Sequence, residues 1–333
     1  STPTRLALVE PGTPVPNGLA PITMESAPQV SLLAEWHESS VSDLAWMPDG
    51  RFLAVSTTDR IDLYQLETRT VVRTLYPTKS GIIRIAFSPD SNWLVVGCRQ
   101  GEEQTGYASS LELWRGPNWK PLGILYGNTI GLSDMVFLPD SDYLAVAYSR
   151  PGIQVSQVDF WATSSWLINT TFDIGSVLNL SISDSGQYLA TSPDRYGIQV
   201  WDVLEHIFLY KLPTSFTGAV NALKFSPDSG TLATGHYDGM VRIWDVKEQK
   251  MLLEFDTGAV VQSLAFSPDG LLLATGGAFE NSAVQLWSAG SGAHLRTLEN
   301  PPGGISRLIF SPEANYLISA SYNGNLRLWG LRP

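Results

Sequence analysis

A short phrase that recurs seven times along the chain predicts an all-β fold built from equivalent units. In this phrase an aromatic or aliphatic residue precedes a tight polar turn, as in Phe225-Ser226-Pro227-Asp228. Successive copies lie 41, 50, 45, 43, 41 and 44 residues apart, starting at Trp46, Phe87, Phe137, Ile182, Phe225, Phe266 and Phe310. This period is expected of a four-stranded blade. The sequence therefore predicts one seven-bladed antiparallel β-propeller.

A second landmark places the four strands of each repeat in order. The phrase ends a first strand, and the run after it, such as Leu271 to Thr275, is the second strand. An aromatic residue recurs on the third strand, at Tyr64, Trp114, Trp161, Trp201, Trp244, Trp287 and Trp329. Polar and apolar residues alternate around it, as in Val241 to Asp245, which indicates a strand with one buried face. A segment such as Met251 to Phe255 forms the fourth strand.

The two ends of the repeat array predict how the ring closes. Only four residues follow Trp329, too few for a fourth strand in the last repeat. Residues 29 to 36 precede the first repeat and align with the fourth strands of other repeats. We therefore expect this segment to complete the last blade, because a closed ring protects sheet edges that an open array would expose.

The chain resembles the WD40 repeat proteins over roughly residues 29 to 333. The resemblance rests on the Phe-Ser-Pro-Asp turns, the seven copies and the pairs Trp201-Asp202 and Trp244-Asp245. It implies a noncatalytic scaffold, because proteins of this family mostly hold other proteins within larger complexes. We divide the chain into a Pro-rich extended tether, residues 1 to 28, and the propeller domain, residues 29 to 333.

The resemblance also implies part of a hydrogen-bonded tetrad of His, Ser or Thr, Asp and Trp in repeats four to seven. The matching positions are Thr191, Trp201, Thr234, Asp238, Trp244, Thr275, Trp287, Ser319, Asn323 and Trp329. In repeats one to three, Val55, Val96 and Val146 replace the hydroxyl residue, and the tetrad His is largely absent. The chain departs from the family here, and its blades are expected to rely more on packing.

The composition favours a globular protein and disfavours anionic partners. Apolar residues make up 44% of the chain, enough to build a core. The 32 acidic and 21 basic residues give a net charge of -11, which repels nucleic acid and anionic membrane surfaces. We therefore expect a protein or peptide partner with a basic surface, and no nucleic acid. No apolar run is long enough for a membrane-spanning helix.

The composition of the first 28 residues is relevant to the cellular location of the protein. Residues 1 to 28 contain six prolines among Thr, Gly and Ser, a composition typical of an extended tether. The sequence begins at Ser1, which fits either a removed signal or lipid-anchor segment or a trimmed start. On this basis we favour an extracytoplasmic or cell-surface location over a cytoplasmic one.

No motif for catalysis or for a cofactor is found in the sequence. The four histidines, at positions 37, 206, 236 and 294, are far apart, and the single Cys98 excludes an internal disulfide. His-Glu-x-x-His, phosphate-binding Gly-rich and Gly-x-Ser-x-Gly motifs are absent. Asp140-Ser141-Asp142 is interpreted as a turn and not as a calcium site, because Asp bonds the backbone in turns. We predict no catalytic residue, no metal and no cofactor.

The connections between second and third strands predict a binding surface. They are longest in repeats two and three, over Arg99 to Ser110 and Tyr148 to Ser156. Loops on a rigid scaffold carry function, although neutral insertion explains the extra length equally well. Each of repeats two to seven has one aromatic residue there: Tyr107, Tyr148, Tyr196, Tyr237, Phe279 and Tyr322. We expect these rings to anchor a partner, unless they lean on a neighbouring blade, with Arg99, Arg150 and Arg195 as polar contacts.

The sequence thus predicts a protein-protein interaction scaffold that binds a protein or peptide on this loop-rich face. Two alternatives remain open. One is a structural subunit of a larger assembly, for example at the cell surface, tethered through residues 1 to 28. The other is a propeller enzyme or small-molecule binder that uses the central channel, for which the sequence offers Asp59, Asp194 and Asp238 at the channel mouth.

Overall fold

The computed structural model describes residues 19–66, 68, 70–100, 108–126, 131–149, 157–174, 179–192, 197–212, 219–278, 283–298 and 303–332. Within these residues the chain forms the strands β1 to β28 and one short 3-10 helix, η1 (Ala27–Gln29). No helix in these ranges is long and apolar enough to cross a membrane.

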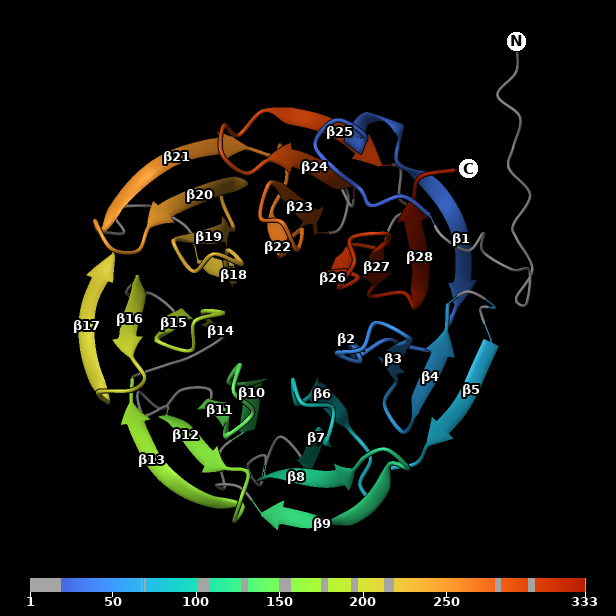
Figure 1. Ribbon diagram of the computed structural model, residues 1–333, viewed down its shortest axis with the longest axis vertical. Helices are drawn as coiled ribbons and strands as arrows, with labels where there is room; N and C mark the ends of the chain where they lie inside the picture. The colour runs from blue at the N-terminus through green and yellow to red at the C-terminus, as the bar shows by residue number, and fades with distance from the viewer. Residues whose placement is uncertain are drawn as a thin grey trace.

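The strands form seven four-stranded antiparallel sheets, which Figure 1 shows as blades around a common centre. Blade one contains β2 (Asp43–Trp46), β3 (Phe52–Ser56), β4 (Ile61–Gln65) and β5 (Thr70–Leu75), and blade two contains β6 (Ile82–Phe87), β7 (Trp93–Gln100), β8 (Ala108–Arg115) and β9 (Lys120–Tyr126). Blade three contains β10 (Gly131–Phe137), β11 (Tyr143–Ser149), β12 (Gln157–Ala162) and β13 (Leu167–Asp173). In each of these three blades the first strand along the chain lies innermost.

The remaining blades repeat this order. Blade four contains β14 (Asn179–Ile182), β15 (Tyr188–Ser192), β16 (Ile198–Asp202) and β17 (Ile207–Leu212), and blade five contains β18 (Val220–Phe225), β19 (Thr231–His236), β20 (Met240–Asp245) and β21 (Lys250–Asp256). Blade six contains β22 (Val261–Phe266), β23 (Leu272–Gly277), β24 (Val284–Ser288) and β25 (His294–Leu298). Blade seven contains β26 (Ile305–Phe310), β27 (Leu317–Ser321), β28 (Asn325–Gly330) and, outermost, β1 (Ser31–His37).

The predicted closure is confirmed. β1 pairs antiparallel with β28, so Leu32 lies opposite Trp329 and Trp36 opposite Leu326. An ion pair of 3.1 Å between Glu35 and Arg327 joins the same two strands. Figure 1 shows this strand, from the start of the chain, beside the last strand of the ring. This pairing could be predicted from the sequence, because the last repeat has too few residues for its own outer strand.

Packing begins before the predicted domain boundary at residue 28. Leu19, Ile22 and Ala27 are buried, and the Ile22 N–H donates to the Ala314 carbonyl at 2.9 Å. The expectation of an extended tether is therefore wrong for residues 19–28, where Ile22 and Ala27 pack on the core that joins blades six and seven and Leu19 packs on the core that joins blades seven and one. Residues 1–18 lie outside the described residues.

The hydrophobic core lies between neighbouring blades. One cluster joins Val95 and Leu111 of blade two to Leu132 and Val146 of blade three. Close approach requires a small residue on the second strand: a Cβ at Gly97 would lie 2.5 Å from the Leu132 side chain. The same distance would separate a Cβ at Gly235 or Gly276 from the next blade. Each blade is thus held by its neighbours, which fixes the direction of its connections.

The polar turn after the inner strand has the same backbone conformation in every blade. Its fifth residue has a positive φ, from 58° to 74°, at Gly50, Ser91, Ser141, Gly186, Ser229, Gly270 and Ala314. In three of the turns a serine hydroxyl donates to the aspartate two residues later at 2.5 Å: Ser88 to Asp90, Ser226 to Asp228 and Ser267 to Asp269. These acids therefore stabilise turns, and glycine suits the left-handed position because it has no Cβ.

Candidate functional site

Strand direction alternates within each blade, so the connections between second and third strands lie on the same face as those joining one blade to the next. We call this the connection face. Among the residues that the structure describes, three exposed tyrosines lie on it, Tyr237 after β19, Tyr322 after β27 and Tyr76 after β5. Their exposed fractions are 65%, 53% and 70%. Tyr76 was not predicted, because it lies in the connection between two repeats and not between the second and third strands of one repeat.

The other predicted binding residues have different positions. Tyr148 is fully buried in the core between blades two and three, so the expectation that it anchors a partner is wrong. Its ring fills a space that the core of two blades encloses. Arg99 is exposed near the end of β7. The remaining predicted residues lie outside the described ranges: Tyr107, Tyr196, Phe279, Arg150 and Arg195.

Exposed carboxylates flank the tyrosines of the connection face. Asp59 and Asp256 are exposed, and Asp238 follows Tyr237 directly. Partial burial raises the pKa of Asp238, but the bond from Arg242, at 3.0 Å, the bond from the Met240 N–H, at 3.0 Å, and the charge of Arg242 together outweigh this effect and hold the pKa below its usual range. Asp238 therefore stays ionised at neutral pH, and the face around Tyr237 carries negative charge.

Three predicted tetrads contain a bond from the Trp indole to the hydroxyl residue. Trp244 donates to Thr234 at 3.0 Å, Trp287 to Thr275 at 3.0 Å, and Trp329 to Ser319 at 2.9 Å. Blade four differs: the Thr191 hydroxyl and the Trp201 indole N–H are buried without a partner among the described residues. The predicted bond in repeat four is therefore wrong. The Trp201 ring stacks on Phe172 of blade three, with centroids 5.3 Å apart.

The other tetrad positions make different contacts. Asp238 bonds Arg242, and the Asn323 side chain accepts a bond from the Ser321 hydroxyl. His236, fully buried, places Nε2 2.8 Å from the Thr234 hydroxyl. Blade five thus has a histidine in its polar network. The sequence analysis did not place His236 in the tetrad, although Thr234-Gly235-His236 was a signal, because residues at i and i+2 of one strand share a face.

Blade one lacks the hydroxyl residue and has a different polar network. Arg60 donates to Asp62 and to Glu38, each at 2.8 Å. The hydroxyl of Tyr64, which replaces the Trp of the other repeats, donates to Glu38. Glu38 and Asp62 are both buried, and their charges are compensated by Arg60 and by the Thr74 hydroxyl. Buried charges need such partners, so this network is part of the blade's architecture.

Blades two and three bury a carboxylate at the position equivalent to Asp62. The Thr78 N–H donates to Glu112 at 2.7 Å, and the Thr171 hydroxyl donates to Asp159 at 2.7 Å. Burial raises the pKa of Glu112 and Asp159 even though these bonds act in the opposite direction. The division predicted between repeats one to three and the rest therefore has a physical basis in buried acids.

A further polar ring lines the central channel and was not predicted. It occupies the position three residues before each repeat start, at Asp43, Arg84, Asp134, Asn179, Ala222, Ser263 and Arg307. Six of these seven residues are polar, although the strands around them are apolar, and that repeated polarity was the available signal. The inner strands bring the ring together around a cavity of about 230 Å³.

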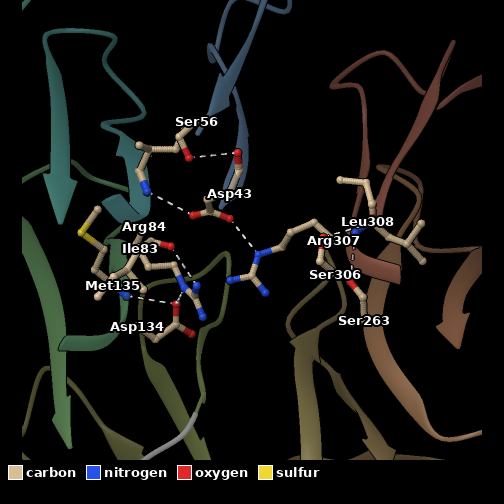
Figure 2. Close-up of polar contacts among 12 residues, drawn as sticks. Asp43, Ser56, Ile83, Arg84, Asp134, Met135, Ser263, Ser306, Arg307 and Leu308 are labelled. Carbon is tan, nitrogen blue, oxygen red and sulfur yellow. Dashed lines mark hydrogen bonds and ion pairs between the residues drawn. The ribbon is translucent and has the colours of Figure 1, made fainter. Parts of the chain in front are cut away.

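Charged residues of this ring bond several neighbouring blades to one another, and Figure 2 shows part of these contacts. Arg307 Nε contacts Asp43 Oδ1 at 2.7 Å, and the other Asp43 oxygen accepts the Ile85 N–H at 3.1 Å. Arg84 Nε contacts Asp134 Oδ1 at 3.0 Å, and the other Asp134 oxygen accepts the Leu180 N–H at 3.0 Å. These bonds connect blade seven with one and two, and blade two with three and four. In the described part of the chain no three His, Cys, Asp or Glu side chains are grouped as metal ligands.

Two family models match the chain. The model described as WD domain, G-beta repeat matches residues 208–245, 249–288 and 292–330. The model described as Anaphase-promoting complex subunit 4 WD40 domain matches residues 29–90. The first three matches end at or just beyond Trp244, Trp287 and Trp329, the residues that bond a hydroxyl. The residues that match the WD domain, G-beta repeat model thus include the three Trp–hydroxyl pairs.

Relatives with known names cover parts of the chain at modest identity. Periodic tryptophan protein 2 of Arabidopsis thaliana is 29% identical over 171 residues, 51% of this chain and 19% of the relative. WD repeat-containing protein srw1 of Schizosaccharomyces pombe is 25% identical over 84% of this chain and 49% of its own length. WD repeat and SOCS box-containing protein 1 of Homo sapiens is 33% identical over 59% of this chain and 48% of its own length. The chain thus spans about half, or less, of these relatives.

Proposed function

The chain is a seven-bladed WD40 repeat protein, and we propose that it is a noncatalytic scaffold that holds a basic protein or peptide on its connection face. The observation that carries this proposal is the exposure of Tyr76, Tyr237 and Tyr322 on one face. The exposure of large aromatic rings to water is unfavourable, and such side chains are enriched at protein interfaces. They are therefore suited to be the apolar anchors of a partner.

The charge of the chain and of this face supports a basic partner. The net charge is -11, and Asp59, Asp238 and Asp256 are exposed near the tyrosines. Opposite charge speeds diffusional encounter and disfavours acidic competitors, whereas buried aromatic anchors supply most of the affinity. Several relatives are named as components of larger particles, among them a small ribosomal subunit protein and a telomerase protein component. Membership of a multi-subunit complex is therefore part of the proposal.

Site-specific photo-crosslinking tests which face is used. A photoreactive phenylalanine analogue is placed at Tyr237 or Tyr322, and, as matched controls, at Leu204 or Leu271. The two leucines are also exposed, at 69% and 53%, but lie in the turns of the opposite face. We expect the connection-face positions to capture a common basic protein in cells of the source organism. Capture of that protein mainly from positions 204 and 271 would show that the opposite face is used.

A further inference from the structure

The central channel has features of a binding site that does not depend on the connection face. Its cavity, about 230 Å³, is lined by the inner strands β2, β6, β10, β14, β18, β22 and β26. Sites for drug-sized ligands are larger, roughly 300–1,000 Å³. The channel therefore suits a small molecule or one functional group. The residues around it divide into a charged half and an amide half.

The charged half has no carboxylate oxygen left without a partner. Asp43 accepts bonds from Arg307 and from the Ile85 N–H, one on each oxygen. Asp134 accepts bonds from Arg84 and from the Met135 and Leu180 N–H groups. Two or three donors on each carboxylate compensate its charge. The two aspartates thus connect neighbouring blades. Little of their capacity to bind a cation remains.

The two guanidinium groups, by contrast, have unused donors. Arg307 contacts Asp43 through Nε, and Figure 2 shows its terminal nitrogens turned away from that carboxylate. No described residue accepts a bond from those two nitrogens. Arg84 uses Nε for Asp134 and Nη1 for the Ile83 carbonyl, so its Nη2 has no partner within the described ranges. Burial acts to lower the pKa of Arg307, but attraction by Asp43 and Asp134 outweighs it and raises the pKa, so the group stays charged.

The other half of the channel carries neutral amides. Asn179, Asn221 and Gln262 lie on the inner side of blades four to six and line the same cavity. The Gln262 carboxamide makes no hydrogen bond to any described residue, and Asn221 uses Nδ2 for the Val261 carbonyl at 3.3 Å. Amides both donate and accept, so they can bond hydroxyl groups. Unused donors on one side and amides on the other define the chemistry that would fit.

We propose that the channel binds a small hydroxylated oxyanion, whose carboxylate or phosphate group contacts Arg307 and Arg84 and whose hydroxyl groups contact the amides. Guanidinium edges present parallel N–H donors that match the oxygens of carboxylate and phosphate. The two arginines and two aspartates sum to zero charge, so recognition rests on directed donors and not on a strong field. Small size and a single anionic group are therefore required of the ligand.

Calorimetric titration at constant ionic strength tests this proposal with three probes. Gluconate presents a carboxylate with hydroxyl groups, glucose 6-phosphate presents a phosphate with hydroxyl groups, and glucose has hydroxyl groups alone. We expect saturable binding at one site per chain for gluconate, for glucose 6-phosphate or for both, and none for glucose. The first two probes distinguish the two anionic groups. Absence of saturable binding by either, or equal binding of glucose, would overturn the proposal.

Variants tie the binding to the channel. Arg307→Lys keeps the charge beside Asp43 but removes the terminal guanidinium donors, so we expect the dissociation constant to rise about tenfold, which corresponds to ~1.4 kcal/mol. Arg51→Lys is the matched control, because Arg51 is an exposed arginine paired with Asp49 in a turn. Gln262→Ala removes an amide that bonds no described residue and should weaken binding without loss of folding. Affinities unchanged in both channel variants would contradict the assignment.

Discussion

At the residue scale, Thr191 and Thr234 occupy the same position in neighbouring blades but have different surroundings. The Thr234 hydroxyl accepts the Trp244 indole N–H at 3.0 Å and lies 2.8 Å from His236. The Thr191 hydroxyl is buried and has no partner among the described residues. A buried polar group costs free energy when it is left without a bond. The same residue type therefore stabilises blade five and not blade four.

This contrast predicts that a change from threonine to valine affects stability differently in the two blades. Thr234→Val should lower the free energy of unfolding by about 1–3 kcal/mol, because it leaves the Trp244 indole N–H without its acceptor. Thr191→Val should change the stability by less than about 0.5 kcal/mol or raise it. Valine fits this position, since Val55, Val96 and Val146 occupy it in blades one to three. Urea unfolding of both variants measures the difference, and equal losses would contradict the assignment of the bonds.

The repeat pattern could predict the positions of these residues in their strands, but not their hydrogen bonds. It placed Thr191 and Trp201 in register with the bonded pairs, but register alone does not orient an indole toward a hydroxyl. Packing decided the outcome, because the Trp201 ring stacks on Phe172 of the preceding blade. Tyr148 was predicted to lie in a connection, but it belongs to β11, where it pairs with Leu132 and Gln157 and its ring is in the core.

At the element scale, β1 decides whether the ring is closed. It supplies the outer strand of blade seven, and its residues from Ser31 to His37 pair along β28. Leu32 and Leu33 pack against the cores on the two sides of that blade. Periodicity and the short C-terminal end were sufficient to predict this strand. The packed segment 19–28 could not be predicted, because its proline-rich composition is typical of extended tethers.

Deletion of residues 29–37 should therefore open the ring. Leu32 and Leu33 are partly buried, so each contributes less than the roughly 1.5–3 kcal/mol of a fully buried leucine, and β28 would in addition expose its edge. We expect a clearly lower melting temperature and a tendency to associate. A synthetic peptide of residues 29–38 added to the truncated protein should restore the melting temperature. The same peptide with Glu35→Lys should restore less, because lysine would face Arg327. A truncated protein as stable as the full chain would refute the closure by β1.

At the scale of the whole molecule, the ring positions two distinct surfaces. The connection face presents exposed tyrosines among carboxylates, and the channel presents arginines whose aspartate partners join the blades. Sequence predicted the first surface from aromatic residues in the connections. It missed the second, because a polar residue within an apolar strand acquires meaning only when the ring brings all seven copies together around one axis.

The central claim is that the connection face holds the partner, and the affinity of the captured protein tests it most directly. The dissociation constant is measured by calorimetry for the unmodified chain, for Tyr237→Ala/Tyr322→Ala and for the opposite-face control Leu204→Ala/Leu271→Ala. We expect the tyrosine variant to bind at least about tenfold more weakly, since aromatic anchors dominate interface energies, and the leucine variant to bind normally. A tyrosine variant with unchanged affinity beside a weakened leucine variant would contradict the account.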